Sequence, residues 1–437
     1  MDGTRRTDGP LSLTLRRLAL AVALCAPIGL VGTAHGADAR HWTRLGELGR
    51  QARVAVAGTV TRTASFDDGR LVVAYVRPER VLKGDPGPGD VAIVEEHDLP
   101  SSPTLLPAGQ HVVVFLVRAP HTSSLAKALP PGPTYYAPVQ GRMGVLASPS
   151  PESIAEASSL VSRWAALATD QAGDATARAA ATRALAFDEI AAAHPLVVED
   201  GAQAIAALPD LAATLDDAEQ RRLAAVLARR DLPPRVRVAL VQAIAAERLV
   251  ALVPALAGLR DAPPEVLAAS FDARARLGSP PSLSELASFA KSDDPAVRAV
   301  VSPALLAAGG EKAVPLVEHM ALKDRDATVG KAATQALGRV KTPGGLAALA
   351  RIYERSAAQR QTAGTVIVGW GGDAAAETLA RLAFEAPPNA QRGAVALLFS
   401  LGRNRDDPHL VRIRTTHPDP SVREFAEEGF DLGTEHH

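Results

Sequence analysis

The stretch Ser292-Asp293-Asp294-Pro295-Ala296-Val297-Arg298 decides the fold of most of this chain. It recurs near the end as His417-Pro418-Asp419-Pro420-Ser421-Val422-Arg423. Both copies place an aspartate before a proline and a Val-Arg pair shortly after it. An aspartate at the N-cap accepts hydrogen bonds from free N–H groups of the first helical turn, and proline suits the first helical position. Each copy therefore predicts the start of a helix.

Prolines set the period of this pattern. They lie 30, 31, 93 and 32 residues apart, and 93 is three times 31. Apolar residues follow each proline at helical spacing. The period therefore predicts a repeat of about 31 residues, which has room for two helices and two tight turns. The prolines are Pro234, Pro264, Pro295, Pro388 and Pro420.

A ladder of arginines runs in phase with the prolines. One hypothesis is that each arginine binds an aspartate or a turn carbonyl of a neighbouring repeat and so fixes the stacking. The other is that the arginines form a line of cations for an acidic ligand. A fixed place in every copy favours stacking, although Gly330 replaces the arginine in one repeat. The ladder consists of Arg237, Arg298, Arg360, Arg392 and Arg423.

The Asp-Pro-x-Val-Arg opening resembles that of short HEAT repeats, including those grouped with phycobilisome lyases. The resemblance implies an all-α solenoid over residues 188–430, a non-enzymatic scaffold for a protein or peptide partner along its second helices. The copies before Asp231 are degenerate, so the first hairpins are predicted from helical periodicity alone. The link to bilin lyases leaves a lyase-like enzyme subunit as an alternative.

Residues 40–148 have a different pattern, with period two and short β-branched runs typical of strands. The step Asp67-Asp68-Gly69 separates two such runs and tolerates the positive φ of a tight hairpin turn. These features predict a small barrel or sandwich. The expected strands are 53–60, 71–76, 90–95, 110–117 and 143–146.

The order of motifs in this front region is similar to that of netrin-like and metalloproteinase-inhibitor barrels of OB type. The motifs are Val56-x-Gly58-x-Val60, the turn at 81–85 and the valine-rich strand at 109–116. The resemblance implies an OB-like barrel. Those inhibitors chelate a metal through an N-terminal cysteine, which this region lacks. A protease-inhibitor-like binding module that uses the barrel edge remains a second alternative.

Residues 1–39 have the layout of a bacterial Sec-type signal peptide. Arginines precede an apolar run at 18–31, and small residues follow it, with cleavage expected after Gly36 or Ala39. The run is shorter than the roughly 20 residues of a membrane-spanning helix. Lipidation of Cys25 is not expected because Leu24 precedes it. We therefore expect a periplasmic or secreted protein without cysteine and without a membrane span once the signal is removed.

Composition and motifs give no sign of catalysis. The 47 basic and 48 acidic residues leave a net charge of −1, which argues against nucleic acid as a partner. No catalytic or cofactor-binding motif was found, so no catalytic, cofactor or metal residue is predicted. The run Glu95-Glu96-His97-Asp98 would place Glu95 and His97 on one strand face, but a solvated strand end explains it better.

The predicted chain is thus a multidomain β + α protein: a small N-terminal OB-like β-barrel, then an all-α HEAT-repeat solenoid. Residues 149–187 are expected to form a linker and a connecting helix, and 431–437 a disordered tail. The glycine-rich stretch 368–373 is expected to be a widened turn with Trp370 as a possible exposed contact. His409, His417, His436 and His437 are expected to be solvated.

Overall fold

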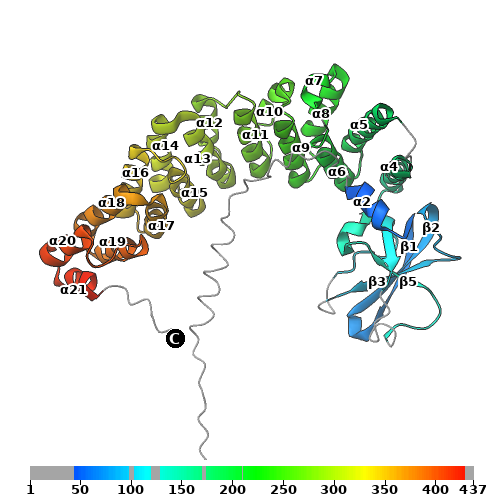
Figure 1. Ribbon diagram of the computed structural model, residues 1–437, viewed down its shortest axis with the longest axis horizontal. Coiled ribbons are helices and arrows are strands. Elements are labelled where there is room, and N and C mark those ends of the chain that lie inside the picture. Colours follow the sequence, from blue (N-terminus) through cyan, green and yellow to red (C-terminus); the bar gives the residue numbers. More distant parts are fainter. Residues whose placement is uncertain (1–43, 98–102, 120–127, 170–173, 209, 429–437) are drawn as a thin grey trace, which may run out of the picture. The chain divides into compact units, whose positions relative to one another are not determined.

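A computed structural model describes residues 44–97, 103–119, 128–169, 174–208 and 210–428 (Figure 1). The predicted signal peptide with Cys25, the predicted tail, and His436 and His437 lie outside these residues.

The front region contains a six-stranded sheet. β1 pairs antiparallel with both β2 and β4, β2 pairs with β3, β3 pairs in parallel with β5, and β5 pairs with β4. The pairings therefore run in a ring from β1 through β2, β3, β5 and β4 back to β1, and β6 adds to β4. The strands are β1 (Val54–Phe66), β2 (Leu71–Lys83), β3 (Val91–Glu96), β4 (His111–Arg118), β5 (Tyr135–Pro138) and β6 (Val145–Ser148).

The strand predictions hold for β1 to β4, with two additions. Asp67, Asp68 and Gly69 form the turn η1 (Asp67–Gly69), and all three have positive φ, as the hairpin prediction requires. The short strand β5 was not predicted because it spans four residues and ends in Pro138. The helix α2 (Arg44–Gln51) was also missed in a region interpreted as strands. Residues 141–144, partly predicted as strand, form the turn η2 (Gly141–Gly144) before β6.

Alternation along β1 separates two apolar cores. Val54 and Val56 belong to a cluster with buried side chains of β2, β3, β4 and β5. Ala55 and Ala57 point the other way, into a core shared with α2 and the helices that follow. The sheet is therefore covered on its second face by helical residues and is continuous in packing with the first part of the array.

Two helices connect the sheet to the repeats. They are α4 (Pro151–Thr169) and α5 (Ala175–Ala191), and α5 runs across the expected boundary at Asp188. α4 contacts β4, β6 and α5, and α2 contacts α4 and α6 (Pro195–Ile205).

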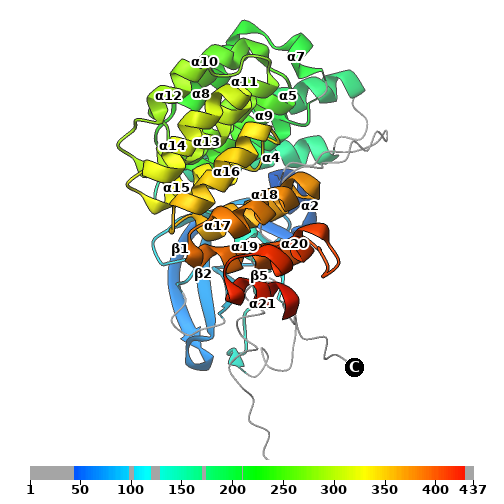
Figure 2. The ribbon, with the colours of Figure 1, turned by 90° about the vertical axis from the view of Figure 1, so that its left-hand side faces the viewer.

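The array consists of helical hairpins, each with a first and a second helix (Figures 1 and 2). Each first helix packs on the next, and from α14 onward the second helices do the same. The array opens with α6, α7 (Leu211–Thr214) and α8 (Asp217–Ala228). The first helices are α9 (Pro234–Ala246), α11 (Pro264–Arg276), α13 (Pro295–Gly309), α15 (Ala327–Leu337), α17 (Arg360–Trp370), α19 (Pro388–Ser400) and α21 (Pro420–Glu428). The second helices are α10 (Val253–Ala257), α12 (Leu283–Phe289), α14 (Val314–Lys323), α16 (Pro343–Arg355), α18 (Gly372–Glu385) and α20 (Pro408–Thr416). The turn η3 (Val250–Leu252) precedes α10, and η4 (Gly310–Ala313) precedes α14.

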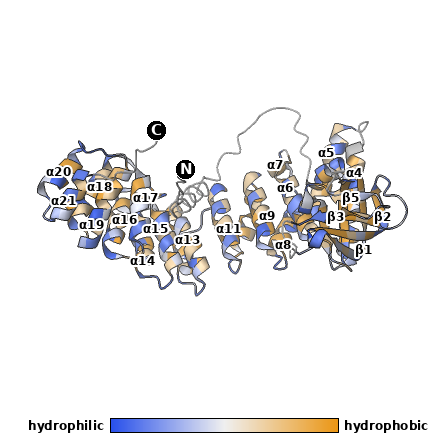
Figure 3. Cartoon of the chain, turned by 90° about the horizontal axis from the view of Figure 1, so that it is seen from below, coloured by the Kyte–Doolittle hydropathy of each residue, from blue (hydrophilic) through white to orange (hydrophobic). Residues whose placement is uncertain are grey.

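All five period-setting prolines are the first residue of a first helix, in α9, α11, α13, α19 and α21. Asp294 caps α13, since its Oδ1 accepts a hydrogen bond from Ala296 N–H at 2.8 Å. Asp419 does the same for Ser421 N–H at 2.8 Å. Figure 3 shows hydrophilic and hydrophobic residues side by side along the helices of the array, as expected where one face packs and the other meets water.

One stretch of the array, Pro295–Lys323, is long and apolar enough by composition to cross a membrane. The structure divides it into α13 and α14 at Gly310, whose φ is +51°. Val301 and Leu305 of α13 and Val317 of α14 are fully buried in the core of the array. The apolar character of this stretch is therefore explained by packing within one repeat.

Candidate functional site

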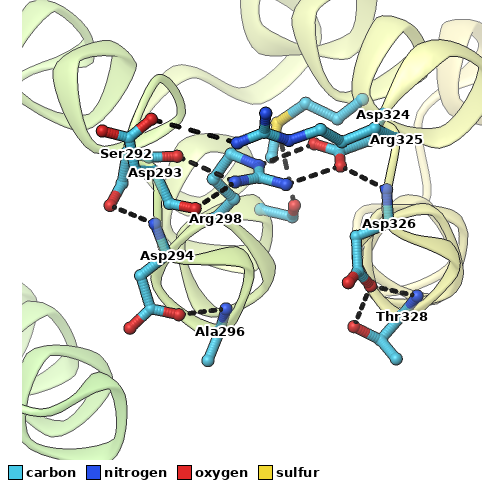
Figure 4. A network of polar contacts seen from close by, with 11 residues as sticks. Ser292, Asp293, Asp294, Ala296, Arg298, Asp324, Arg325, Asp326 and Thr328 are labelled. Carbon is cyan, nitrogen blue, oxygen red and sulfur yellow. Dashed lines mark hydrogen bonds and ion pairs between the residues drawn. The ribbon is translucent and has the colours of Figure 1, made fainter.

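Arg298 ties together the loops that precede two successive first helices (Figure 4). Its Nε and Nη2 donate to the two carboxylate oxygens of Asp324, each at 2.8 Å. Its Nη1 donates to the carbonyls of Ser292 at 2.8 Å and Asp293 at 3.1 Å. Asp324 also accepts from Asp326 N–H at 2.9 Å. The four hydrogen bonds of Arg298 thus join the loop before α13 to the loop before α15, and the fifth bond orders the loop before α15.

The electrostatics of this pair follow from the geometry. The hydrogen bond from Arg298 holds the pKa of the Asp324 carboxyl below its usual range, and the same bond raises the pKa of Arg298. Both side chains are almost entirely buried, so water screens the pair little.

Two other arginines of the ladder also donate to carbonyls that precede their own helix in the chain. Arg423 Nη1 donates to the carbonyls of His417 at 2.6 Å and Pro418 at 3.1 Å. Arg360 Nε donates to the carbonyl of Tyr353 at 3.0 Å, and its Nη1 reaches Asn389 Oδ1 in the next repeat at 3.5 Å. Arg423 therefore repeats the contacts that Arg298 makes with its own loop, whereas Arg360, the first residue of α17, donates to a carbonyl of α16.

The assignment of Arg392 to the ladder is wrong by one residue. Arg392 is exposed, and its guanidinium lies 5.0 Å from the ring centroid of Phe425. The inward position belongs to Gln391, whose Nε2 donates to the carbonyls of Phe384 at 3.2 Å and Ala386 at 3.0 Å. An amide can therefore replace the guanidinium as donor to the loop, which a search for arginines could not detect.

Gly330, the exception in the ladder, makes room for a neighbour. A Cβ at this position would lie 2.9 Å from Gln359 Nε2. That nitrogen donates to the carbonyl of Ala327, the first residue of the same helix α15, at 3.3 Å. The side chain of Gln359, from the next repeat, thus occupies the space that an arginine would fill.

Arg237 has the ladder position but not the ladder contacts. It is only 5% exposed, yet no described residue accepts a hydrogen bond from its guanidinium, and its Nε is buried without a partner. Burial lowers the pKa of Arg237, and the nearby Arg230 lowers it further. Among the described ladder residues, it is the one buried cation without an anion beside it.

A second set of contacts joins the second helices and was not predicted. Arg351 of α16 binds Glu318 of α14 through two hydrogen bonds of 2.7 Å. Arg381 of α18 binds Glu354 of α16 at 3.2 Å. The spacing between partners differs from one pair to the next, so no fixed period marks them in the sequence. Half-exposed ion pairs of this kind stabilise a protein little.

Trp370 is the last residue of α17 and is half-buried against the core of the array. Its carbonyl accepts a hydrogen bond from Lys341 Nζ at 3.2 Å. The turn predicted at 368–373 is present, but it is tight rather than widened, because Gly371 alone separates α17 from α18 and has φ of +75°. The indole is therefore partly a packing residue, with only a part left for contact.

The run at 95–98 is not a solvated strand end, because Glu95 is 4% exposed. Its carboxylate accepts hydrogen bonds from Thr104 Oγ1 at 2.9 Å and Leu105 N–H at 2.7 Å, and His97 Nε2 lies 3.4 Å away. Asp98 lies outside the described residues. In the part of the chain that the structure describes, no three His, Cys, Asp or Glu side chains are grouped to hold a metal. Glu95 therefore anchors the loop at 103–106.

His417 is not solvated either. It is 1% exposed, its Nε2 lies 2.9 Å from the carbonyl of Ala383, and its Nδ1 accepts from Asp419 N–H at 3.1 Å. These bonds assign the proton to Nε2. His417 thus joins α18 to the turn before α21. His409 is half-exposed.

A buried pair of carboxyls lies where α2 meets the first helices. Glu189 of α5 and Asp200 of α6 are at most 1% exposed. Trp164 Nε1 donates to Glu189, and Leu45 N–H of α2 donates to Asp200 at 3.0 Å. Burial, and then the charge of Asp200, raise the pKa of Glu189 well above its ordinary value. This pair was not predicted, because neither residue belongs to a motif that recurs along the chain.

Comparison with known families identifies part of the array. A family model for HEAT repeats matches residues 250–338, from η3 to the end of α15. This match and the succession of helical hairpins support a HEAT-repeat protein, and HEAT repeats generally mediate protein–protein interactions. No curated protein matches the sequence.

Proposed function

We propose that this protein is an exported, non-enzymatic scaffold that binds a protein or peptide partner along its HEAT-type array. The observation that carries the proposal is the array itself, in which successive first helices pack on one another from α9 to α21 and residues 250–338 match a HEAT-repeat model. Stacked repeats offer a long continuous surface instead of a single pocket. Such a surface suits an extended polypeptide.

The surface of the second helices is the proposed contact face. Its ion pairs, Glu318–Arg351 and Glu354–Arg381, hold charged side chains in place between repeats. Side chains fixed before binding lose less conformational entropy when a partner arrives. His319 of α14 and Glu377 of α18 lie exposed beside these pairs and are available for contact.

Affinity capture from an extract of the cell envelope tests the proposal. The bait is the protein without residues 1–39, compared with a double variant of the second helices, His319→Glu with Glu377→Lys. Lys331→Glu, exposed on the first helix α15, and Arg80→Glu, exposed on β2, are controls. We expect the double variant to lose a partner that both controls retain. Loss in Arg80→Glu alone would instead favour the inhibitor-like module. Substrate turnover that a single substitution abolishes would contradict a non-enzymatic scaffold.

For the front region we propose a closed barrel of OB type that positions the array. The ring of strand pairings and the shared core of β1 to β5 support closure. At Gly58, β1 lies so close to β2 that a Cβ would be 2.0 Å from the carbonyl oxygen of Arg77, too close for any other residue. Contacts of α4 with both β4 and α5 would transmit the position of the barrel to the repeats.

Export to the periplasm or the medium is proposed from the signal-like segment at 1–39. Cell fractionation of the full chain and of a chain lacking this segment tests it. We expect the full chain outside the cytoplasm in a shortened form and the truncated chain inside; an unprocessed full chain in the cytoplasm would contradict export.

A further inference from the structure

Arg237 and Arg298 stand at equivalent positions, each four residues after the N-cap of its helix. The guanidinium of Arg298 meets the Asp324 carboxylate two residues before the next first helix's N-cap, Asp326. The residue at the corresponding place for Arg237 is Asp261, two residues before the N-cap Pro263. The two repeats therefore contain an arginine and an aspartate at equivalent positions.

Asp261 does not bind Arg237. Its carboxylate lies 3.5 Å from Arg230, and both of these side chains are more than four-fifths exposed. The place that Asp324 takes beside Arg298 is thus not taken by Asp261 beside Arg237. A guanidinium that is buried without an acceptor is costly, since it has lost water and gained no partner.

The surroundings of Arg237 favour an anion. Burial, and then repulsion from Arg230, lower the pKa of Arg237, and the exposed Arg235 lies two residues before Arg237 in the sequence. Arg235 is held only by a 3.6 Å contact with Glu199. An incoming anion would relieve the repulsion between these cations.

We infer that Arg237 is a binding position for a carboxylate of an acidic segment in the polypeptide partner, seated as Asp324 is seated at Arg298. A carboxylate is favoured because this position on the ladder already accommodates one in the repeat of Arg298, through Nε and Nη2. The inference rests on the proposed function, because it takes the ligand to be a polypeptide. It adds a contact on the first helix α9 to the contact face proposed on the second helices. At Arg237, it also supports the hypothesis that arginines of the ladder bind an acidic ligand.

Fluorescence anisotropy with two short labelled peptides tests the inference. One alternates Glu and Ser, and the other alternates Gln and Ser. We expect the protein to bind the Glu peptide about tenfold more tightly than the Gln peptide, and Arg237→Gln to lose about that factor, the usual worth of a hydrogen bond to a charged group. Arg392→Gln, which removes an exposed arginine of another first helix, is the matched control and should bind as the unaltered protein does.

Equal binding of both peptides, or equal loss in the two variants, would overturn the inference, and so would absence of binding by the Glu peptide. Capture of a partner from the envelope extract then decides the scaffold proposal separately. Asp261→Asn tests whether Asp261, and not a ligand, is the partner of Arg237. If Asp261 neutralised Arg237 in solution, this variant would lower the melting temperature and weaken no peptide; we expect an unchanged melting temperature.

Discussion

The repeat around Arg298 and the repeat around Arg237 place the same residue in opposite circumstances. Arg298 is surrounded by a carboxylate and two carbonyls, which together accept from its Nε and both of its Nη groups. Arg237 is buried to the same extent, 5% exposed in each case, and has no acceptor among the described residues. The recurring arginine therefore identifies an equivalent position in each repeat, but it does not predict that the side chain makes the same interaction.

The difference arises in the loop, not in the helix. The loop before α15 directs Asp324 inward, where it also accepts from Asp326 N–H. The loop before α11 has prolines at 263 and 264. Pro263 therefore offers no side-chain hydroxyl or carboxylate to cap the helix, and α11 shows no side-chain cap. Asp261 lies exposed beside Arg230. Stacking contacts are thus complete in one repeat and open in the other.

Asp324→Asn should have the largest effect on stability, because it leaves Arg298 buried without a charged partner, as Arg237 is. A buried ion pair that loses one partner is strongly destabilised. We expect the melting temperature to fall by several degrees. The control is Asp293→Asn, an exposed aspartate 3.9 Å from Arg325, which should have little effect.

The stabilising effect of the pair formed by Arg298 and Asp324 should depend on pH. Arg298 lowers the pKa of Asp324 in the folded chain, so this pair stabilises the fold above the ordinary pKa of an aspartate and loses that contribution as the pH falls. The melting temperatures of the protein and of Asp324→Asn should therefore converge in acid. A constant difference down to low pH would contradict the role assigned to the carboxylate.

Glu189→Gln tests the junction of α2 with the first helices, where the buried carboxyl of Glu189 lies near a second carboxyl, that of Asp200. Its pKa is raised in the folded chain, so stability is greatest below the ordinary pKa of a glutamate and declines as the pH rises towards the raised value. The decline approaches about 1.4 kcal/mol per pH unit. Chemical denaturation across this range should show the slope in the protein and a flatter profile in Glu189→Gln. A parallel profile would mean that Glu189 is ionised in the fold.

Gln391→Ala should have a moderate effect. It removes the two hydrogen bonds that Gln391 donates to the loop before α19. A neutral hydrogen bond contributes about 1 kcal/mol, so we expect a loss of roughly 1 to 2 kcal/mol in the free energy of unfolding. An unchanged free energy would show that an amide does not replace the ladder arginine.

Arg392→Ala should have the smallest effect of the set. The side chain is exposed, and its contact is with the ring of Phe425 at 5.0 Å. An exposed cation–π contact contributes about 0.5 to 1 kcal/mol, so we expect a loss of at most that order by chemical denaturation. A larger loss than in Gln391→Ala would restore Arg392 to the ladder.

Periodic features of the fold could be predicted, because the start of a helix in each repeat requires similar residue types at the same positions. Pro295 and Asp294 start α13 by fixed φ and by capping, and the same physics acts at Pro420 and Asp419. The turn at Asp67–Gly69 was equally predictable, since positive φ restricts the residue types there.

Features that depend on contacts between distant residues could not be predicted. Strand β5 exists because β3 and β4 flank it, and its own four residues carry no strong signal. Glu189 and Asp200 meet only when α5 packs on α6. The lack of a partner for Arg237 depends on the direction of one loop side chain. Gln391 could not be predicted from the arginine pattern, because the position requires a hydrogen-bond donor and not an arginine.

The most direct test measures thermal unfolding of Arg298→Met and Arg237→Met side by side. Methionine fills a similar apolar volume without a charge. If Arg298 stabilises the stacking of repeats and Arg237 binds a ligand, Arg298→Met should lower the melting temperature. Arg237→Met should raise it, because this substitution removes a buried charge that has no partner. A fall of similar size in both variants would contradict the account, because Arg237 would then stabilise the stack as Arg298 does.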